Sequence, residues 1–267
     1  MLDATLWIFL TCLALGSVVG LLAGLLGIGG GLLVVPALTF LFPLVDIVPD
    51  QVMPMALATS LASIVLTASS SARSHYKMGN VDIRVIRTLL PGILIGGLLG
   101  SALADMMPTE ILPKVFGGIV LLLAIQMLIS MRFKSSAALP DKFGNLIGGT
   151  GIGVTSSLAG IGGGSLIVPY LSYFGVEMRR AIGSASLCGV FLAISGMTGF
   201  IFFGFHHHEP LPPYSIGYVY LPALLGIVST SVLTTGYGAR LATQLPVDAI
   251  KKVFALFLIC VAFTMLI

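Results

Sequence analysis

The chain has 267 residues, of which 57% are hydrophobic and 9% are charged, and its formal net charge is +3. Because soluble domains carry roughly 25% charged residues, this composition excludes a chain whose surface faces water and predicts an all-α polytopic membrane protein in a lipid bilayer. The basic residues lie in short loops and form no basic face, so we expect no nucleic-acid partner, and three cysteines scattered through apolar segments favour neither a disulfide framework nor a metal site.

The first predicted element is an apolar segment over 5–26, which is too long for the roughly 7–15-residue core of a cleaved signal sequence. It ends at a glycine motif, Gly27-Ile28-Gly29-Gly30-Gly31, and a second apolar run follows over 32–43. A glycine-rich break at membrane depth is tolerated only where it lines a cavity or is buried in protein. We therefore predict a broken-helix hairpin that enters the membrane, turns at the glycines and leaves on the same side. Whether its arms span fully or are re-entrant stays open.

Three full transmembrane helices are expected after this hairpin, from apolar stretches at 51–72, 88–105 and 110–131. A second hairpin and three further helices are expected from apolar stretches at 143–160, 165–175, 181–205, 210–239 and 253–267. The predicted organisation is a first transmembrane repeat at 1–131, a cytoplasmic linker at 132–142 and a second transmembrane repeat at 143–267.

The second half of the chain repeats motifs of the first. The glycine motif recurs at 160–164, and each copy is followed by a proline, Pro36 or Pro169. Two further matches pair Lys114-Val115-Phe116 with Lys252-Val253-Phe254, and Leu90-Pro91 with Leu221-Pro222. Duplication at this period in a membrane chain predicts two bundles about a pseudo-two-fold axis.

The charges in matching loops predict that these two repeats are inverted. The loop after the first glycine motif is acidic, with Asp46 and Asp50, whereas the loop after the second is basic, with Arg179 and Arg180. The next loop is basic in the first half and lacks Lys and Arg in the second. Since Lys and Arg mark cytoplasmic loops, matching loops face opposite sides, and both termini are predicted outside.

The glycine motifs are the predicted substrate site. Glycine lets the backbone approach a ligand closely, and a helix that starts there presents free N–H groups and a partial positive charge, which together bind an anion without a basic side chain. The alternative is a tight helix crossing without a ligand. The candidate residues are Gly29, Gly30, Gly31, Gly162, Gly163, Gly164 and Ser165.

Polar side chains near the motifs complete the predicted site. Thr59, Ser60, Ser184 and Ser186 are candidate donors to an oxyanion, and the alternative is that they are small residues of helix packing. Arg73 and His75 are candidate mouth or gate residues, or else interfacial residues of a cytoplasmic loop. The His206–His208 run could hold a metal loosely, but an exposed polar loop explains it better, because the run lacks helical ligand spacing.

These residues resemble a known family. The two glycine motifs, Ala58-Thr59-Ser60-Leu61 and the segment 75–82 are similar to the signatures of the sulfite exporter TauE/SafE family, over essentially the whole chain. In this comparison, Ala185 stands where the second half of the family's pattern has threonine. The resemblance implies a bacterial-type inner-membrane permease and a secondary transporter for sulfur-containing anions.

The predicted function is therefore export of small sulfur-containing anions, such as sulfite or organosulfonates, by alternating access, with no enzymatic activity and no cofactor. An anion channel, or a permease for another small oxyanion, is the first alternative. An intramembrane hydrolase using Ser165 and His75 is the weakest, since His75 lies at a helix end. A coupling proton, the exact anion and the oligomeric state stay open.

Overall fold

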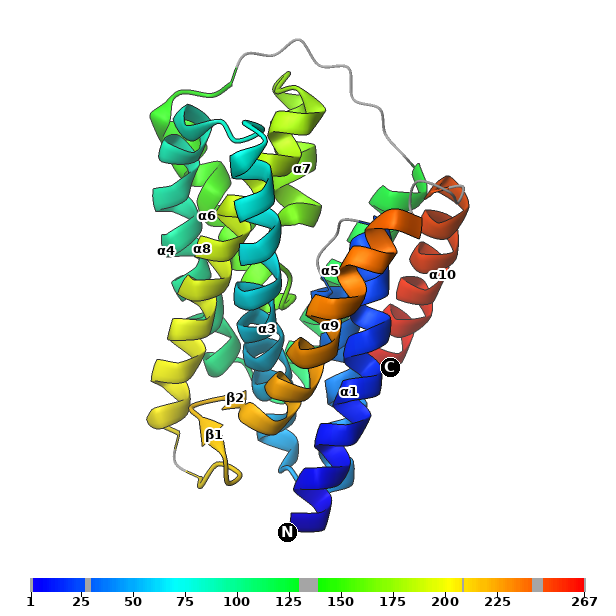
Figure 1. The fold of residues 1–267 in the computed structure, drawn as a ribbon. Helices are drawn as coiled ribbons and strands as arrows, with labels where there is room; N and C mark the ends of the chain where they lie inside the picture. The colour runs from blue at the N-terminus through cyan, green and yellow to red at the C-terminus, as the bar shows by residue number, and fades with distance from the viewer. Residues whose placement is uncertain (1, 27–29, 130–138, 208, 242–246, 267) are drawn as a thin grey trace.

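The structure is a computed structural model, and it describes residues 2–26, 30–129, 139–207, 209–241 and 247–266. The prediction of an all-α polytopic membrane protein is confirmed (Figure 1). Two short antiparallel strands form a small hairpin and are the only strands in the described ranges. The predicted linker spans 132–142, and its residues 132–138 lie outside the described residues.

The helices follow the predicted order in both halves of the chain. The first half contains α1 (Leu2–Leu26), α2 (Gly31–Leu41), the 3-10 turn η1 (Phe42–Val45), α3 (Pro49–Lys77), α4 (Ile83–Met106) and α5 (Ile111–Ile129). The second half contains α6 (Lys142–Leu158), α7 (Gly164–Tyr173), α8 (Met178–Phe205), β1 (Ser215–Ile216), β2 (Val219–Tyr220), α9 (Leu221–Leu241) and α10 (Val247–Leu266).

Six of the described helices are long and apolar enough to cross a membrane: α1, α3, α4, α5, α8 and α9. The arm α1 is therefore long enough to span, which the sequence left open. By contrast, α2 has 11 residues and α7 has 10, which is about 15 Å of helix at 1.5 Å per residue and half of a bilayer core. The short arms α2 and α7, which begin at Gly31 and Gly164, are thus too short to cross the bilayer core.

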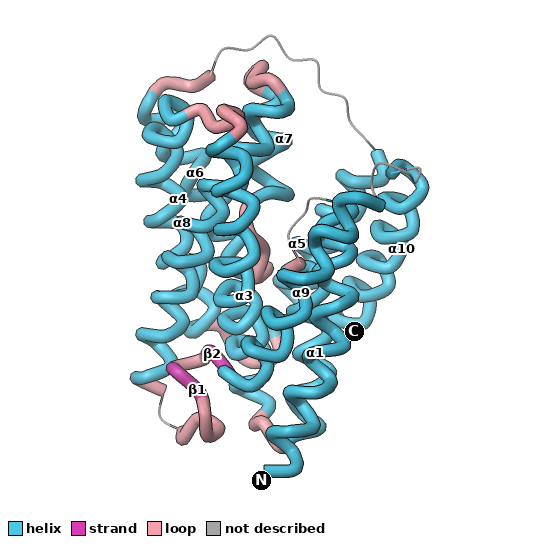
Figure 2. The backbone as a smooth tube through the Cα atoms, in the orientation of Figure 1, coloured by secondary structure: helices cyan, strands magenta, loops and turns pink. Residues whose placement is uncertain are grey.

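The helices form a central pair and flanking pairs. The central pair is α3 and α8, and the flanking pairs are α1 with α9, α4 with α6, and α5 with α10 (Figures 1 and 2). Helix α3 is the most buried of the six long apolar helices. Each hairpin's long arm therefore packs on a helix of the other half, so neither half buries its apolar surface alone.

Small residues let α1 and α9 approach at backbone distance. Gly16 of α1 lies against the carbonyl of Ile227, and Gly20 lies against the carbonyl of Ser231. A Cβ at either glycine would overlap that carbonyl, which explains why this helix pair carries glycine here. Close approach through small residues is the usual way in which transmembrane helices gain packing energy.

The same contact recurs between α6 and α4. Gly149 of α6 lies against the carbonyl of Leu89, and Gly153 lies against the carbonyl of Ile93. Gly149 and Gly153 follow Gly16 and Gly20 by the same number of positions that separates the two glycine motifs. Ile227 and Ser231 follow Leu89 and Ile93 by the same number of positions that separates Lys114 from Lys252. These contacts fit the match of Lys114 with Lys252 and not the different spacing of Leu90-Pro91 and Leu221-Pro222, which stays a prediction from the sequence.

The two ends of the molecule differ in charge. We call the end that carries β1 and β2 the β-hairpin end, and the end where α3 gives way to α4 the α7 end (Figure 1). The loops between α3 and α4 and between α7 and α8 lie at the α7 end, which holds Lys77, Arg84, Arg87, Arg179 and Arg180 beside the acidic residues Asp82, Asp141 and Glu177. The loops before α3, between α4 and α5 and after α8 lie at the β-hairpin end, which holds Asp46, Asp50, Asp105, Glu110 and Glu209.

Candidate transport site at the hairpin tips

The tips of the two hairpins touch. Gly31, the first residue of α2, lies so close to the carbonyl oxygen of Gly160 that a Cβ on Gly31 would overlap it. The same carbonyl accepts a hydrogen bond from the Ser60 hydroxyl of α3 at 2.8 Å. Both broken helices and the central helix α3 therefore meet at the Gly160 carbonyl.

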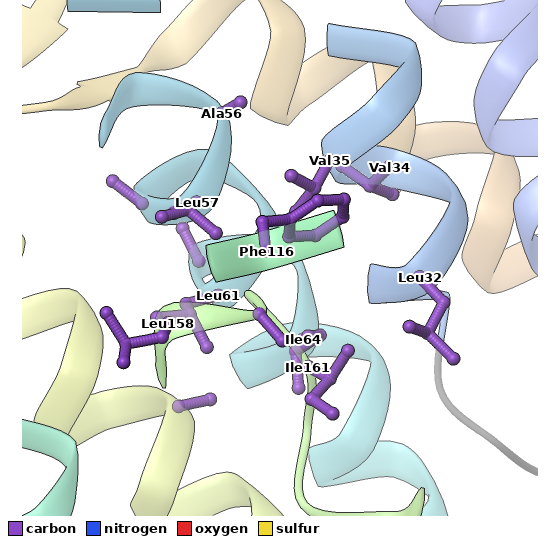
Figure 3. Packing of buried hydrophobic residues seen from close by; sticks show 14 of the residues in the cluster. Leu32, Val34, Val35, Ala56, Leu57, Leu61, Ile64, Phe116, Leu158 and Ile161 are labelled. Atoms are coloured by element: carbon purple, nitrogen blue, oxygen red, sulfur yellow. The ribbon is translucent and has the colours of Figure 1, made fainter. Parts of the chain in front are cut away.

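Apolar side chains seal this meeting point. Ile161 is fully buried, and Ile64 of α3 and Leu32 of α2 are 1% and 2% exposed. Figure 3 shows Ile161 and Ile64 together, between α3 and the start of α2. Because hydrogen bonds strengthen in surroundings without water, polar groups at the tips act at greater strength than they would at a surface.

The first tip begins α2 at Gly30. The Gly30 carbonyl accepts hydrogen bonds from the N–H groups of Leu33 and Val34, at 3.0 and 3.1 Å. A Cβ on Gly30 would overlap Val19 of α1, so the turn is packed against its own hairpin arm. The predicted site residue Gly29 lies outside the described residues.

The second tip begins α7 at Gly163, whose φ of 68° favours glycine. Gly164 N–H donates to the Gly162 carbonyl at 2.7 Å, and the next carbonyl, of Gly163, accepts from the first turn of α7. Within the described ranges, neither the N–H nor the buried hydroxyl of Ser165 has a hydrogen-bond partner. A free amide and a free hydroxyl at a helix start are donors suited to an oxyanion.

The four predicted hydroxyls do not converge on one point. Ser60 alone among them bonds to a tip. Thr59 Oγ1 accepts from the N–H of Tyr220, just before α9, at 3.0 Å, and Ser184 Oγ accepts from the N–H of Asp82, just before α4, at 2.9 Å. Thr59 and Ser184 thus make the same bond between halves, each at its own end.

Ser186 lies on the exposed side of α8. Its hydroxyl donates to the Ile182 carbonyl at 3.0 Å and lies 3.4 Å from the Ser71 hydroxyl of α3. The contact joins the central helices near the α7 end, away from the Gly160 carbonyl.

Two buried hydroxyls that the sequence did not single out lie just before the second tip. Ser156 and Ser157 are fully buried at the end of α6, and neither hydroxyl has a partner in the part of the chain that the structure describes. Ser157 packs against Gly100 of α4 and Gly196 of α8. Unpaired buried hydroxyls are costly, so both serines are further candidates to face a polar guest. The only sequence signal was their place in the run before the glycines.

The predicted mouth residues Arg73 and His75 lie near the C-terminal end of α3, at the α7 end. Arg73 is exposed. His75 is half-buried, and its Nδ1 has no partner among the described residues. They lie at the end that carries the basic loops and not at the tips.

The described residues contain no group of three or more His, Cys, Asp and Glu side chains that could hold a metal ion. In the predicted histidine loop, His206 Nδ1 lies 2.8 Å from the Phe202 carbonyl. His207 bonds to Tyr218, and His208 lies outside the described residues.

The fold and the tips define a class: a polytopic helical membrane protein with paired broken helices that meet inside the bundle. The sulfite exporter TauE/SafE family matches residues 12–265. The chain therefore belongs to the sulfite exporter TauE/SafE family, and it is a membrane transporter and not an enzyme.

Curated relatives cover between 70% and 96% of the chain. A probable membrane transporter protein of Haemophilus influenzae is 44% identical over 96% of this chain and 97% of its own length. One from Methanocaldococcus jannaschii is 29% identical over 85% of this chain and 83% of its own length. One from Bacillus subtilis, YdhB, is 30% identical over 70% of this chain and 76% of its own length. No solved structure matches the chain.

Proposed function

We propose that the protein is a secondary transporter that exports small sulfur-containing anions, such as sulfite or organosulfonates, across a bacterial-type inner membrane by alternating access. The observation that carries this proposal is the meeting of the two hairpin tips at the Gly160 carbonyl, together with the free donors of Ser165 in the first turn of α7. The family supports the sulfur-anion substrate.

The tips offer an anion dipoles and hydroxyls and no opposing charge. None of the residues 160–169 is charged, and neither is any of the residues 30–36. The start of α7 contributes the partial positive charge of its macrodipole, and Ser165 contributes two donors. Ser60 holds the Gly160 carbonyl, so this acceptor is turned toward α3 and not toward the anion.

We infer that the two halves are inverted repeats, with 1–131 and 143–267 as the repeating units. The hairpin α1–α2 opens toward the β-hairpin end, and the hairpin α6–α7 opens toward the α7 end (Figure 1). Inverted repeats around a midplane site are typical of secondary transporters. The recurring glycine contacts and the paired bonds to Thr59 and Ser184 support this inference.

One pair of equivalent interfaces differs, and this difference suggests the moving part. Helix α4 packs along α8, where the Ser195 hydroxyl donates to the Leu94 carbonyl at 2.6 Å. The equivalent pair, α9 and α3, is in contact mainly near the start of α9 and diverges toward the α7 end (Figure 1).

The Asp82–Ser184 and Tyr220–Thr59 bonds indicate which positions of the two halves correspond: Asp82 to Tyr220, and Ser184 to Thr59. At the same spacings along the chain, Ser70 of α3 corresponds to Ser195, and Val232 of α9 corresponds to Leu94. Both Ser70 and Val232 are exposed. In the opposite state we expect α9 to close on α3 through this pair while α4 leaves α8. The tips would then face the other side of the membrane.

The charge difference between the two ends supports export. With the basic α7 end in the cytoplasm, Arg73, His75 and the nearby arginines would raise the local anion concentration at the entrance. The acidic β-hairpin end would face outside with both termini and would repel an anion after release.

Transport by the purified protein in proteoliposomes tests the proposal. We expect saturable, electroneutral or proton-linked efflux of sulfite, with counterflow when sulfite is present on both sides. Flux without saturation or counterflow would identify an anion channel. Absence of flux with sulfite, thiosulfate and organosulfonates alike would refute the sulfur-anion substrate.

A further inference from the structure

Three buried serines lie along the interface between α4 and α8, on the way from the second tip to the β-hairpin end. Ser101 of α4 and Ser157 of α6 are fully buried, and Ser195 of α8 is 6% exposed. We call these three residues the serine row. The stretches 88–104, 143–158 and 181–205 contain no charged residue, so an anion on this interface would meet hydroxyls and no basic side chain.

The row lies within the contact of α4 and α8 and not beside it. Each hydroxyl lies against a glycine of a neighbouring helix: Ser195 against Gly97, Ser157 against Gly196, and Ser101 against Gly199. These glycines belong to α4 and α8. Separation of α4 from α8 would therefore uncover all three hydroxyls at once.

The bonds of the row show which donors separation would free. The Ser157 hydroxyl has no hydrogen-bond partner among the described residues. The Ser195 hydroxyl donates across the interface to the Leu94 carbonyl at 2.6 Å, and it loses this acceptor when the helices part. The row also begins at the second tip, because the Ser157 carbonyl accepts from the N–H of Gly160 at 3.1 Å.

Helix packing explains why these side chains are small, but it does not explain the hydroxyl of Ser157. Alanine fills nearly the same space, and a buried hydroxyl without a partner costs free energy that alanine does not. A role for the hydroxyl in another state of the protein accounts for this cost.

The corresponding face of α3 also carries hydroxyls. Positions 195, 196 and 199 of α8 face α4, and at the spacing of Thr59 and Ser184 they correspond to Ser70, Ser71 and Ser74 of α3. All three are exposed, on the part of α3 from which α9 diverges (Figure 1). Polar side chains in a membrane bundle usually face its interior or a water-filled cavity. Hydroxyls thus line the same face in both halves, buried in one and exposed in the other.

We propose that the exported anion leaves along the α4–α8 interface, where the hydroxyls of the serine row donate hydrogen bonds to it. This inference rests on the proposed function, and in particular on the exchange of the α4–α8 and α9–α3 interfaces. In the state described here the row is buried and the path is closed. When α4 separates from α8, Ser157 and Ser195 become free donors, and Ser101 exchanges its bond to the Leu98 carbonyl, 2.8 Å long here, for one to the anion.

Alanine substitution distinguishes a path from packing. Ser157→Ala keeps a small side chain in the interface and removes only the hydroxyl, so a packing role predicts unchanged transport. For a path, we expect sulfite flux in proteoliposomes to fall about fivefold or more, the scale of one lost hydrogen bond. Equilibrium affinity for sulfite should stay the same, because Ser157 is buried away from the anion in the state described here. Thr198→Ala, on an exposed hydroxyl of α8, is the control and should change neither quantity.

Thiol labelling reports the opening of the path without any substrate. In a chain without its native cysteines, Ser157→Cys should react with a membrane-impermeant maleimide that is supplied only on the β-hairpin side of oriented vesicles. Ala124→Cys, at a fully buried position of α5, is the matched control and should stay unlabelled. If Ser157→Cys fails to fold, as judged by gel filtration, Ser101→Cys takes its place.

The inference is overturned if Ser157→Ala carries sulfite at the wild-type rate, or if Ser157→Cys reacts no faster than Ala124→Cys. Failure of the proposed substrate would look different. The wild-type protein would then carry no sulfur anion, while the labelling of Ser157→Cys would still show whether the path opens toward the β-hairpin end.

Discussion

The two halves of the molecule use the same contacts at three places and differ at a fourth. The long arms α1 and α6 each approach a helix of the other half through paired glycines, and Thr59 and Ser184 each accept the N–H that precedes such a helix. Between the central helices, the contact of Leu61 with Gly196 near one end corresponds to the contact of Ser71 with Ser186 near the other. The contact of α4 with α8, compared with that of α9 with α3, departs from this pattern.

The difference separates fixed from movable contacts. A glycine contact at backbone distance has no slack, because interiors are packed too densely to slide continuously. Each hairpin arm and its partner helix should therefore move as one body. The α4–α8 interface is extensive, whereas α9 and α3 are in contact mainly near the start of α9, so this is the interface that a two-state transporter would exchange.

The largest effect should come from separating the tips. Gly31→Leu places a side chain where the Gly160 carbonyl lies, so we expect transport to be abolished while the protein still inserts and purifies. Gly118→Leu in α5 is the matched control, because a Cβ there meets open space. Sulfite flux in proteoliposomes measures both, and wild-type flux in Gly31→Leu would exclude the tips as the site.

The second prediction tests the exchange of interfaces directly. In a chain without Cys12, Cys188 and Cys260, the pair Leu94→Cys with Ser195→Cys should cross-link in the state described here. The pair Ser70→Cys with Val232→Cys should cross-link only in the opposite state.

Either cross-link should stop transport, and reduction should restore it. If the Ser70–Val232 pair never cross-links, while the Leu94–Ser195 pair cross-links without stopping transport, the α4–α8 interface is static.

A smaller effect should distinguish the two tips. Ser165→Ala removes one buried donor from the second tip, so anion affinity should fall by about 1–2 kcal/mol, or about five- to thirtyfold. Leu32 begins the equivalent turn of α2 and has no hydroxyl to lose. Equilibrium binding of sulfite measures the change, with Thr155→Ala on an exposed hydroxyl of α6 as the control. Equal affinities would place the donors elsewhere.

The smallest effect concerns the paired bonds. Thr59→Val and Ser184→Ala each leave a backbone N–H without its acceptor, so each should lower the free energy of unfolding by about 1 kcal/mol. Thermal unfolding in detergent measures the loss, and the two values should agree. A large loss of anion affinity with unchanged stability would instead show that both hydroxyls bind the substrate.

Sequence patterns predicted the helical membrane fold, the broken hairpins and the residues at their tips, because charge-free stretches and glycine motifs act locally. Pairing between the halves was harder. The sequence placed Thr59 opposite Ala185, whereas the bonds to Tyr220 and Asp82 pair it with Ser184. Side chains of similar size fit either register, and only contacts across the bundle distinguish the two.

The hydrogen bonds of His207 show a second limit. His207 stood in a run that suggested an exposed polar loop, and its partner Tyr218 lies 11 positions away along the chain. Asp105, which accepts from the Tyr218 hydroxyl, lies 102 positions from His207. The β-hairpin brings Tyr218 back over the end of α4. No local pattern encodes that return, so the grouping becomes visible only in three dimensions.

A density map of the protein in nanodiscs with sulfite is the most direct test of the central claim. The account predicts density for the anion within hydrogen-bond distance of the Ser165 amide and hydroxyl, next to the contact of Gly31 with Gly160. Bound sulfite at any other place, with these tips unchanged and empty, would contradict it.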